Sequence, residues 1–327
     1  MFCSKCGYEL KQGETKCPFC GNEVKEKPTY GKYENPFLAT GNGKSQISEE
    51  KIDEFRTMNG YVNIKTKFFH HILIAGGGYL LMNVLSIIFA LIGVAIAQFM
   101  GNDFSCLYES SDYSACVLGE YELYIKISAI AQLVAELLII GVLVLIFRKY
   151  IKHFFAQLKD KHTWKWIGIG FAIMYGINYA YSMLLTILNI TIETNANQQA
   201  VNEVIFNAPL LGFLFVVVAA PLFEEFIFRF GVFRAFATGN KKSEILGMII
   251  TILVFAGVHL SATFEEALLD IENIDWALIY NDLLSFPIYL AGAFGLTFSY
   301  YKSKNLAAPI VVHMCWNFMS YLANLLV

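Results

Sequence analysis

The chain has 327 residues, of which 56% are hydrophobic and only 16% are charged, and its formal net charge is −3. Soluble domains carry about 25% charged residues. This composition, with a mean hydropathy of +0.51, therefore excludes an ordinary soluble protein and predicts an all-α polytopic membrane bundle. The slightly acidic balance gives no basis for a nucleic-acid partner, and the expected surroundings are the lipid bilayer.

The first 24 residues form a short polar unit with two pairs of cysteines. Cys3 and Cys6, and then Cys17 and Cys20, are spaced C-x-x-C, and a glycine follows each pair. Two thiolates at this spacing bind one metal ion from a tight turn, where the glycine relieves backbone strain. We therefore predict a zinc ribbon over residues 1–24, with a structural Zn²⁺ and a role in binding a protein partner. Disulfides and a redox C-x-x-C are the alternatives, and a reducing compartment disfavours disulfides.

A polar linker, residues 25–65, precedes a series of seven apolar segments. Each has at least about the 20 residues that cross the hydrocarbon core, and some are longer. Pro221 interrupts the fourth segment, so we expect two helical pieces there. We expect the first helix and its outer loop to occupy 66–122 and a protease-like core to occupy 123–327. The predicted helices are 68–99, 123–147, 166–190, 209–233, 244–262, 282–300 and 305–326.

The loops between these segments alternate in charge. Three loops are rich in Lys and Arg: 148–165, 234–243 and 302–304. The three loops that alternate with them contain acidic residues but neither Lys nor Arg: 100–122, 191–208 and 263–281. Basic loops stay on the cytoplasmic side of a membrane. The N-terminus is therefore expected in the cytoplasm and, after seven crossings, the C-terminus outside. The expected location is the plasma membrane.

Charged and polar side chains interrupt three of the apolar segments: Glu224-Glu225 followed by Arg229, then His259, then His313 with Asn317. A carboxylate at membrane depth is costly and is typical of a functional site. A spacing of four places Glu225 and Arg229 on one helix face, as it does His313 and Asn317. The two glutamates point about 100° apart. We therefore expect one carboxylate to activate water and the other to hold Arg229 or a histidine.

In chain order these motifs read E-E-x-x-x-R, F-x-x-x-H and H-x-x-x-N, on separate predicted helices. They resemble the CPBP family of intramembrane metalloproteases, which includes CAAX prenyl endopeptidases, Abi proteins and bacteriocin-processing enzymes. The resemblance covers about residues 120–326; the ribbon and the first helix lie outside it. It implies an all-helical membrane endopeptidase (a hydrolase) that cleaves a membrane-associated protein or peptide.

The resemblance also implies a role for each motif residue. Glu224 is the base that activates water, with Glu225 and Arg229 as its support. His259 and His313 polarise the scissile carbonyl, stabilise the oxyanion or bind metal, and Asn317 is an oxyanion donor. One Glu and two His are a known ligand set for catalytic zinc, so Glu224, His259 and His313 are also candidate ligands of a second Zn²⁺. The sequence leaves metal-bound and metal-free forms open.

Two other functions fit the same residues. One is a non-catalytic membrane scaffold or bacteriocin-immunity protein, whose zinc ribbon binds a partner and whose buried Glu and His only join helices. The other is a proton-coupled transporter with Glu and His as a relay. The chain has no internal repeat of the kind found in many secondary transporters, which counts against the transporter.

Four further residues have less specific patterns. Glu136 lies in the second apolar segment, where it either pairs with Arg229 or lies near the site. Cys106 and Cys116 share an outer loop, where an oxidising exterior would allow a disulfide. Cys315 lies between His313 and Asn317 but points elsewhere on the helix, and we expect it to be a small buried apolar residue.

Overall fold

The computed structural model describes residues 16–21, 68–105, 118–148, 151, 156–237, 240–261, 263–264 and 274–326. Its secondary-structure elements within these ranges are all helices. Three predictions concern residues outside them: the first cysteine pair, Cys3 and Cys6; the linker 25–65; and the pairing of Cys106 with Cys116.

Seven long helical segments correspond to the seven predicted ones. Two of them are composite. Phe68–Phe99 consists of α2 (Phe68–Ile72), η1 (Leu73–Gly77) and α3 (Gly78–Phe99), and Pro209–Phe236 consists of α9 (Pro209–Gly212), η4 (Phe213–Ala219), α10 (Ala220–Glu225), η5 (Phe226–Phe233) and α11 (Arg234–Phe236). The others are α5 (Leu118–Ile146), α7 (Lys161–Ile187), α12 (Lys241–Val258), α14 (Trp276–Ser303) and α15 (Ala307–Leu325); two short helices, η3 (Gln157–Lys159) and α8 (Ala196–Asn207), were not predicted.

Five of the described helices are long and apolar enough to cross a membrane: Phe68–Phe99, Gly119–Ile146, Lys161–Ile187, Pro209–Phe236 and Trp276–Ser303. The other two of the seven predicted spans, α12 and α15, form helices but do not meet this standard. The prediction of a multi-pass, all-helical membrane protein is confirmed, with five candidate spans among the described residues.

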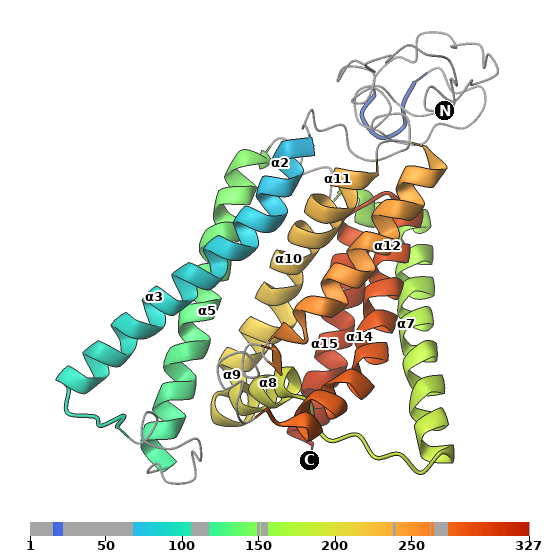
Figure 1. Ribbon diagram of the computed structural model, residues 1–327. Helices are drawn as coiled ribbons and strands as arrows, with labels where there is room; N and C mark the ends of the chain where they lie inside the picture. Colours follow the sequence, from blue (N-terminus) through green and yellow to red (C-terminus); the bar gives the residue numbers. More distant parts are fainter. Residues whose placement is uncertain are drawn as a thin grey trace, which may run out of the picture.

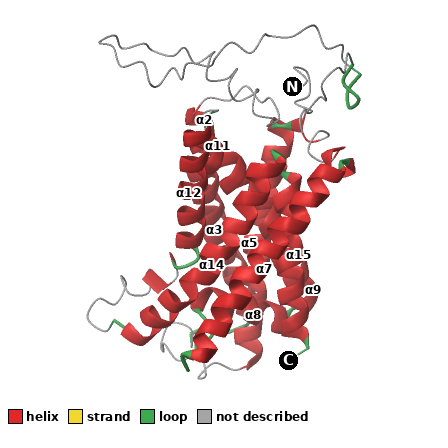
Figure 2. Ribbon diagram, turned by 90° about the vertical axis from the view of Figure 1, so that its right-hand side faces the viewer, coloured by secondary structure: helices red, strands yellow, loops and turns green. Residues whose placement is uncertain are grey.

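The composite helix Pro209–Phe236 lies at the centre of the bundle. α3 and α5 pack along each other on one side of it, while α7, α12, α14 and α15 pack together on the other (Figure 1). In this helix 61% of the most apolar stretch is buried, against 17% for Phe68–Phe99, and every residue of η5 is buried. The short helices α8 and α9 lie towards the end of the bundle at which α15 ends (Figures 1 and 2).

The central helix is continuous through Pro221, so the expectation of two separate pieces is wrong. It alternates instead between α and π geometry, with η4 before α10 and η5 after it. Pro221, at the start of α10, has no N–H and its ring crowds the carbonyl four residues earlier. The wider preceding turn accommodates that ring without breaking the helix.

Each of these two π segments has a carbonyl that accepts a hydrogen bond from a neighbouring helix. The amide Nδ2 of Asn317 on α15 donates to the Val216 carbonyl of η4 at 2.8 Å. The Nδ1 of His71 on α2 lies 2.8 Å from the Phe230 carbonyl of η5. Buried carbonyls need partners, so these side chains stabilise the π geometry on both sides of the glutamate pair.

Helices α7 and α14 cross closely because each has a glycine at the contact. A Cβ on Gly170 would lie 2.8 Å from the Ser299 Cβ, and one on Gly295 would lie 2.9 Å from the Gly170 carbonyl oxygen. Small residues allow helix backbones to approach in this way within membranes. The crossing positions α14 against the central helix.

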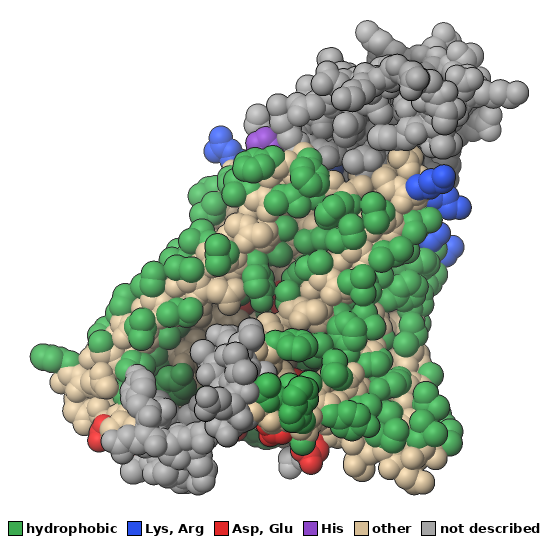
Figure 3. Space-filling view, in the orientation of Figure 1, with side chains coloured by type: hydrophobic (Ala, Val, Ile, Leu, Met, Phe, Trp, Pro, Cys, Tyr) green, Lys and Arg blue, Asp and Glu red, His purple; other side chains and the backbone are tan. Residues whose placement is uncertain are grey.

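The two ends of the bundle differ in charge. On the face shown in Figure 3, Lys and Arg gather at the upper end and Asp and Glu at the lower end. At the basic end Lys304, just after α14, donates to Glu244 on the first turn of α12 at 2.6 Å. Burial lowers the pKa of Lys304, and the Glu244 carboxylate opposes that change. This ion pair links the end of α14 to the start of α12.

Helix α15 turns a stripe of polar side chains towards the bundle. His313 is buried, and Asn317, Ser320 and Asn324 are half-buried. Cys315 points away from the stripe, but it is exposed, so the prediction of a buried residue is wrong. The rotation that carries it away from His313 turns it to the exposed surface of the helix.

The second C-x-x-C pair adopts a tight turn. Cys17 is buried, the Gly21 N–H donates to the Cys17 carbonyl at 2.9 Å, and Gly21 has a positive φ of 69°. Glycine adopts this conformation without the strain of a Cβ, in agreement with the expected role of the glycine.

Candidate functional site

Glu225, Arg229 and His313 form a buried ion-pair network on η5, α10 and α15. The Arg229 Nη1 donates to Glu225 Oε1 at 2.9 Å, and the Nδ1 of His313 lies 2.8 Å from the same oxygen. Both Glu225 and Arg229 have no exposed surface. The predicted pairing of Glu225 with Arg229 is confirmed. A carboxylate oxygen can only accept a hydrogen bond, so the Nδ1 of His313 must carry the hydrogen that it donates to Glu225. The Nε2 of the ring then points away from Glu225.

Two weaker contacts complete the surroundings of Arg229. Its Nη2 approaches the Ala293 carbonyl of α14 at 3.5 Å, and its guanidinium lies 4.5 Å from the ring centre of Phe255 on α12. A cation over an aromatic face is favourable, most of all where water is absent. Arg229 therefore joins α14 and α12 to the central helix.

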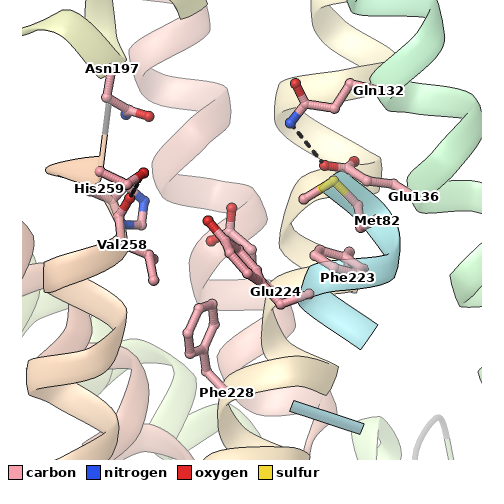
Figure 4. A pocket seen from close by; sticks show the side chains of 11 residues that line it. Met82, Gln132, Glu136, Asn197, Phe223, Glu224, Phe228, Val258 and His259 are labelled. Carbon is pink, nitrogen blue, oxygen red and sulfur yellow. Dashed lines mark hydrogen bonds between the residues drawn. The ribbon is translucent and has the colours of Figure 1, made fainter. Parts of the chain in front are cut away.

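Glu224 has a different environment, although it is the next residue. Its carboxylate lies in a cavity of about 150 Å³, where Oε2 has no hydrogen-bond partner in the protein (Figure 4). The Nε2 of His313 is 3.8 Å from this oxygen, within Coulomb range but beyond hydrogen-bond distance. The expected difference in direction is therefore present: Glu225 holds Arg229 and His313, and Glu224 faces the cavity.

His259 lies directly after α12 and lines the same cavity. Its Nδ1 is 2.8 Å from the Phe255 carbonyl, which makes Nδ1 the donor and leaves Nε2 as an acceptor in the neutral ring. The ring of Tyr289 from α14 lies 4.6 Å away at 30°. The Tyr289 hydroxyl donates to Asn195 at 2.8 Å and accepts from Asn197 at 3.2 Å. The segment at the start of α8 thereby holds the ring that packs on His259.

Asn317 does not line this cavity. Its amide is engaged with the Val216 carbonyl, one helix turn from the buried network. The structure thus places Glu224 and His259 at the cavity, with His313 beside Glu224, and places Glu225 and Arg229 behind them.

Several residues of the site had no assigned role in the sequence. Glu136 on α5 lines the cavity, so it lies near the site, while Arg229 pairs with Glu225. The only feature of the sequence that pointed to Glu136 was its charge within an apolar segment. Asn197 and Tyr289 gave none, because a polar residue near a helix start and an aromatic one in a membrane helix are both common. The whole lining consists of Tyr79, Met82, Gln132, Glu136, Asn197, Phe223, Glu224, Phe228, Val258, His259 and Ser261.

The expected ligands of a second zinc are not gathered around one point in the described part of the chain. No group of three or more His, Cys, Asp or Glu side chains converges as metal ligands anywhere in the described part of the chain. A catalytic zinc site needs three protein ligands around one point. Glu224, His259 and His313 do not converge on one point in this way. The Nδ1 contact of each histidine leaves its Nε2 as the atom that would bind a metal.

Comparison with known proteins agrees with the resemblance over the central part of the chain. Residues 206–319, which include all six motif residues, match the family described as type II CAAX prenyl endopeptidase Rce1-like. The membrane-embedded CAAX protease MroQ of Staphylococcus aureus (strain USA300) is 26% identical over 157 residues, 48% of this chain and 56% of MroQ. The UPF0177 protein YvdC of Lactococcus lactis subsp. lactis (strain IL1403) is 26% identical over 167 residues, 50% of this chain and 55% of YvdC.

The chain therefore matches a little over half the length of each of these curated relatives. No solved structure matches it. The segment that is similar to the Rce1-like family, residues 206–319, contains the buried network and Glu224.

Proposed function

We propose that the protein is an intramembrane endopeptidase that hydrolyses a peptide bond of a membrane-associated protein or peptide. The Rce1-like segment at 206–319 supports a protease. The observation that carries the mechanism is the separation of two adjacent carboxylates. Glu225 accepts hydrogen bonds from Arg229 and His313, whereas the Oε2 of Glu224 has no hydrogen-bond partner in the protein and lies in a cavity large enough for water.

In this mechanism Glu224 accepts a proton from a water molecule, and the oxygen of that water attacks the scissile carbonyl carbon. The carbonyl electron pair moves to its oxygen, which becomes an oxyanion. When the carbonyl re-forms, the C–N bond breaks and the proton on Glu224 passes to the departing amine. The products are a new carboxyl terminus and a new amino terminus.

The two histidines assist different steps. His313 is oriented by Glu225 through Nδ1, so its Nε2, when protonated, stabilises the oxyanion. The Nε2 of His259 accepts a hydrogen from the attacking water and orients it. Asn317 would have to leave the Val216 carbonyl to reach an oxyanion, so we assign it the positioning of α15 against η4. No step is assigned to a metal at this site.

The proposal extends to the N-terminal cysteines and to the orientation of the protein in the membrane. Cys3, Cys6, Cys17 and Cys20 hold a structural zinc in a ribbon that binds a partner protein. The basic end of the bundle and the N-terminus face the cytoplasm, and the C-terminus lies outside the plasma membrane. The charge difference between the two ends supports this orientation.

The Glu224→Gln variant tests the assignment of the base. Loss of a general base lowers a rate by about 10²–10⁴-fold, so we expect the new protein termini seen in membranes of cells with the wild-type protein to disappear. Comparative mass spectrometry of membrane-protein termini measures this. Glu122→Gln serves as the control, since Glu122 lies on α5 beside Lys126 at the outer end and is 41% exposed.

Full retention of those termini in Glu224→Gln would remove Glu224 as the base. If the wild-type protein generates no new termini and Glu224→Gln also preserves the cellular phenotype, the protein is a scaffold or immunity protein instead.

A further inference from the structure

We propose that Glu136 and Gln132 form a subsite of the cavity that binds a cationic side chain of the substrate, Lys or Arg, next to the cleaved bond. The inference rests on the proposed function and adds to it the chemical class of the substrate. Glu136 and Gln132 lie one turn apart on α5, which is not the helix that carries Glu224.

Glu136 is buried and incompletely hydrogen-bonded. It is 2% exposed, and its Oε1 receives only a long contact of 3.5 Å from the Gln132 Nε2. Its Oε2 is buried and has no partner in the protein. A buried carboxylate oxygen without a donor is unfavourable, so it is retained only where another gain offsets it. A donor that enters the cavity would provide that gain.

The carboxyl groups of Glu136 and Glu224 reach the same cavity from two helices, α5 and α10 (Figure 4). Neither Lys nor Arg is among the described residues that line it. The buried Arg229 pairs with Glu225 and does not neutralise the carboxyl groups of Glu136 and Glu224. Two acidic groups around one small cavity favour a cation and repel an anion. An ammonium or guanidinium group is thus a better fit than the free carboxylate at the end of a chain.

The rest of the lining suits the stem of such a side chain. Met82 and Phe223 lie beside Glu136, and Phe228 and Val258 line the same cavity (Figure 4). Lys and Arg bury their methylene groups against apolar surface while their charged head reaches a polar partner. The volume of about 150 Å³ is the size of one side chain rather than of a peptide segment.

A binding experiment tests the subsite without a need for activity. The full-length protein in detergent is titrated with n-butylammonium chloride, a mimic of the Lys side chain, or with 1-butanol as the uncharged match, at constant ionic strength. We expect butylammonium alone to raise the thermal unfolding midpoint, with saturation. In Glu136→Gln this rise is lost, and in Glu122→Gln, the control on the same helix, it is retained.

A second experiment uses a cleaved peptide found by the terminus comparison. Replacing its Lys or Arg next to the bond by norleucine is expected to lower kcat/KM by about tenfold or more in the wild type, as for one charge-assisted hydrogen bond. In Glu136→Gln the two peptides should be cleaved at equal rates. In Glu136→Asp, which keeps the charge and serves if the Gln variant does not fold, the preference should persist.

Equal stabilisation of wild type and Glu136→Gln by butylammonium would overturn the subsite, because the cation would then bind elsewhere. An equal loss of cleavage for basic and norleucine peptides would overturn it too, since a purely structural role acts on all substrates alike. The test of the subsite and the test of Glu224 can fail independently. If butylammonium binds at Glu136 but the Glu224→Gln variant still cleaves, only the assignment of Glu224 as the base is refuted.

Discussion

Glu224 and Glu225 are neighbours in sequence, yet the fold gives them different partners, and this difference separates stability from activity. Glu225 is fully buried and accepts hydrogen bonds from Arg229 and His313. Glu224 contacts neither through a hydrogen bond and lines the cavity. A variant at each position should therefore affect a different property of the protein.

The Glu225→Gln variant is expected to be strongly destabilised. Removing one partner of a buried ion pair leaves the other charge uncompensated and costs about 3–5 kcal/mol. The thermal unfolding midpoint in detergent measures this, with Glu224→Gln as the matched control that keeps a midpoint close to that of the wild type. Equal midpoints for the two variants would contradict the division of roles.

The sequence identified the charged members of the site because charge in an apolar helix is rare and costly. It identified the pairing of Glu225 with Arg229 because helical spacing alone determines it. The roles of Tyr289 and Asn197 could not be predicted from the sequence, because they depend on how α14 and α8 pack near the end of α12. Glu136 was noticed but not placed, since its choice of neighbour is a property of the tertiary structure.

At the scale of the helices, the close crossing of α7 and α14 gives a test of packing. In Gly170→Val the new side chain would collide with Ser299 and with the Gly295 carbonyl, and overpacking of this kind costs about 1–3 kcal/mol. Gly176→Val on the same helix has open space around it and the same change in helix propensity. We expect a lower unfolding midpoint for the first variant only; similar midpoints for both would show that the crossing tolerates a side chain.

The length and apolarity of each segment were enough to predict seven long helices, since a membrane helix must satisfy its own backbone. The π geometry of η4 and η5 was not predictable in this way. It depends on donors from other helices, Asn317 and His71, whose contacts with the central helix no local pattern reveals.

At the scale of the whole molecule, the zinc content of the protein tests the proposed ribbon separately from the site between the helices. We expect the purified full-length protein to contain about one zinc per chain by elemental analysis, as four thiolates complete one tetrahedral site. Cys17→Ser should lose it, while His259→Ala should retain it. A zinc content that falls in His259→Ala would instead assign a metal to the membrane site.

The alternation of α and π turns in the central helix also bears on how this sequence is compared with others. A π turn contains one residue more than an α turn, so the direction of Glu224 depends on the number of residues in η4 as well as on their identity. Removing one residue between 213 and 219 would turn the glutamate pair about 100° relative to the segment before it. A relative that lacks one residue of this π segment therefore aligns with this chain across a single-residue gap, and an ungapped alignment would match Glu224 to the wrong carboxylate.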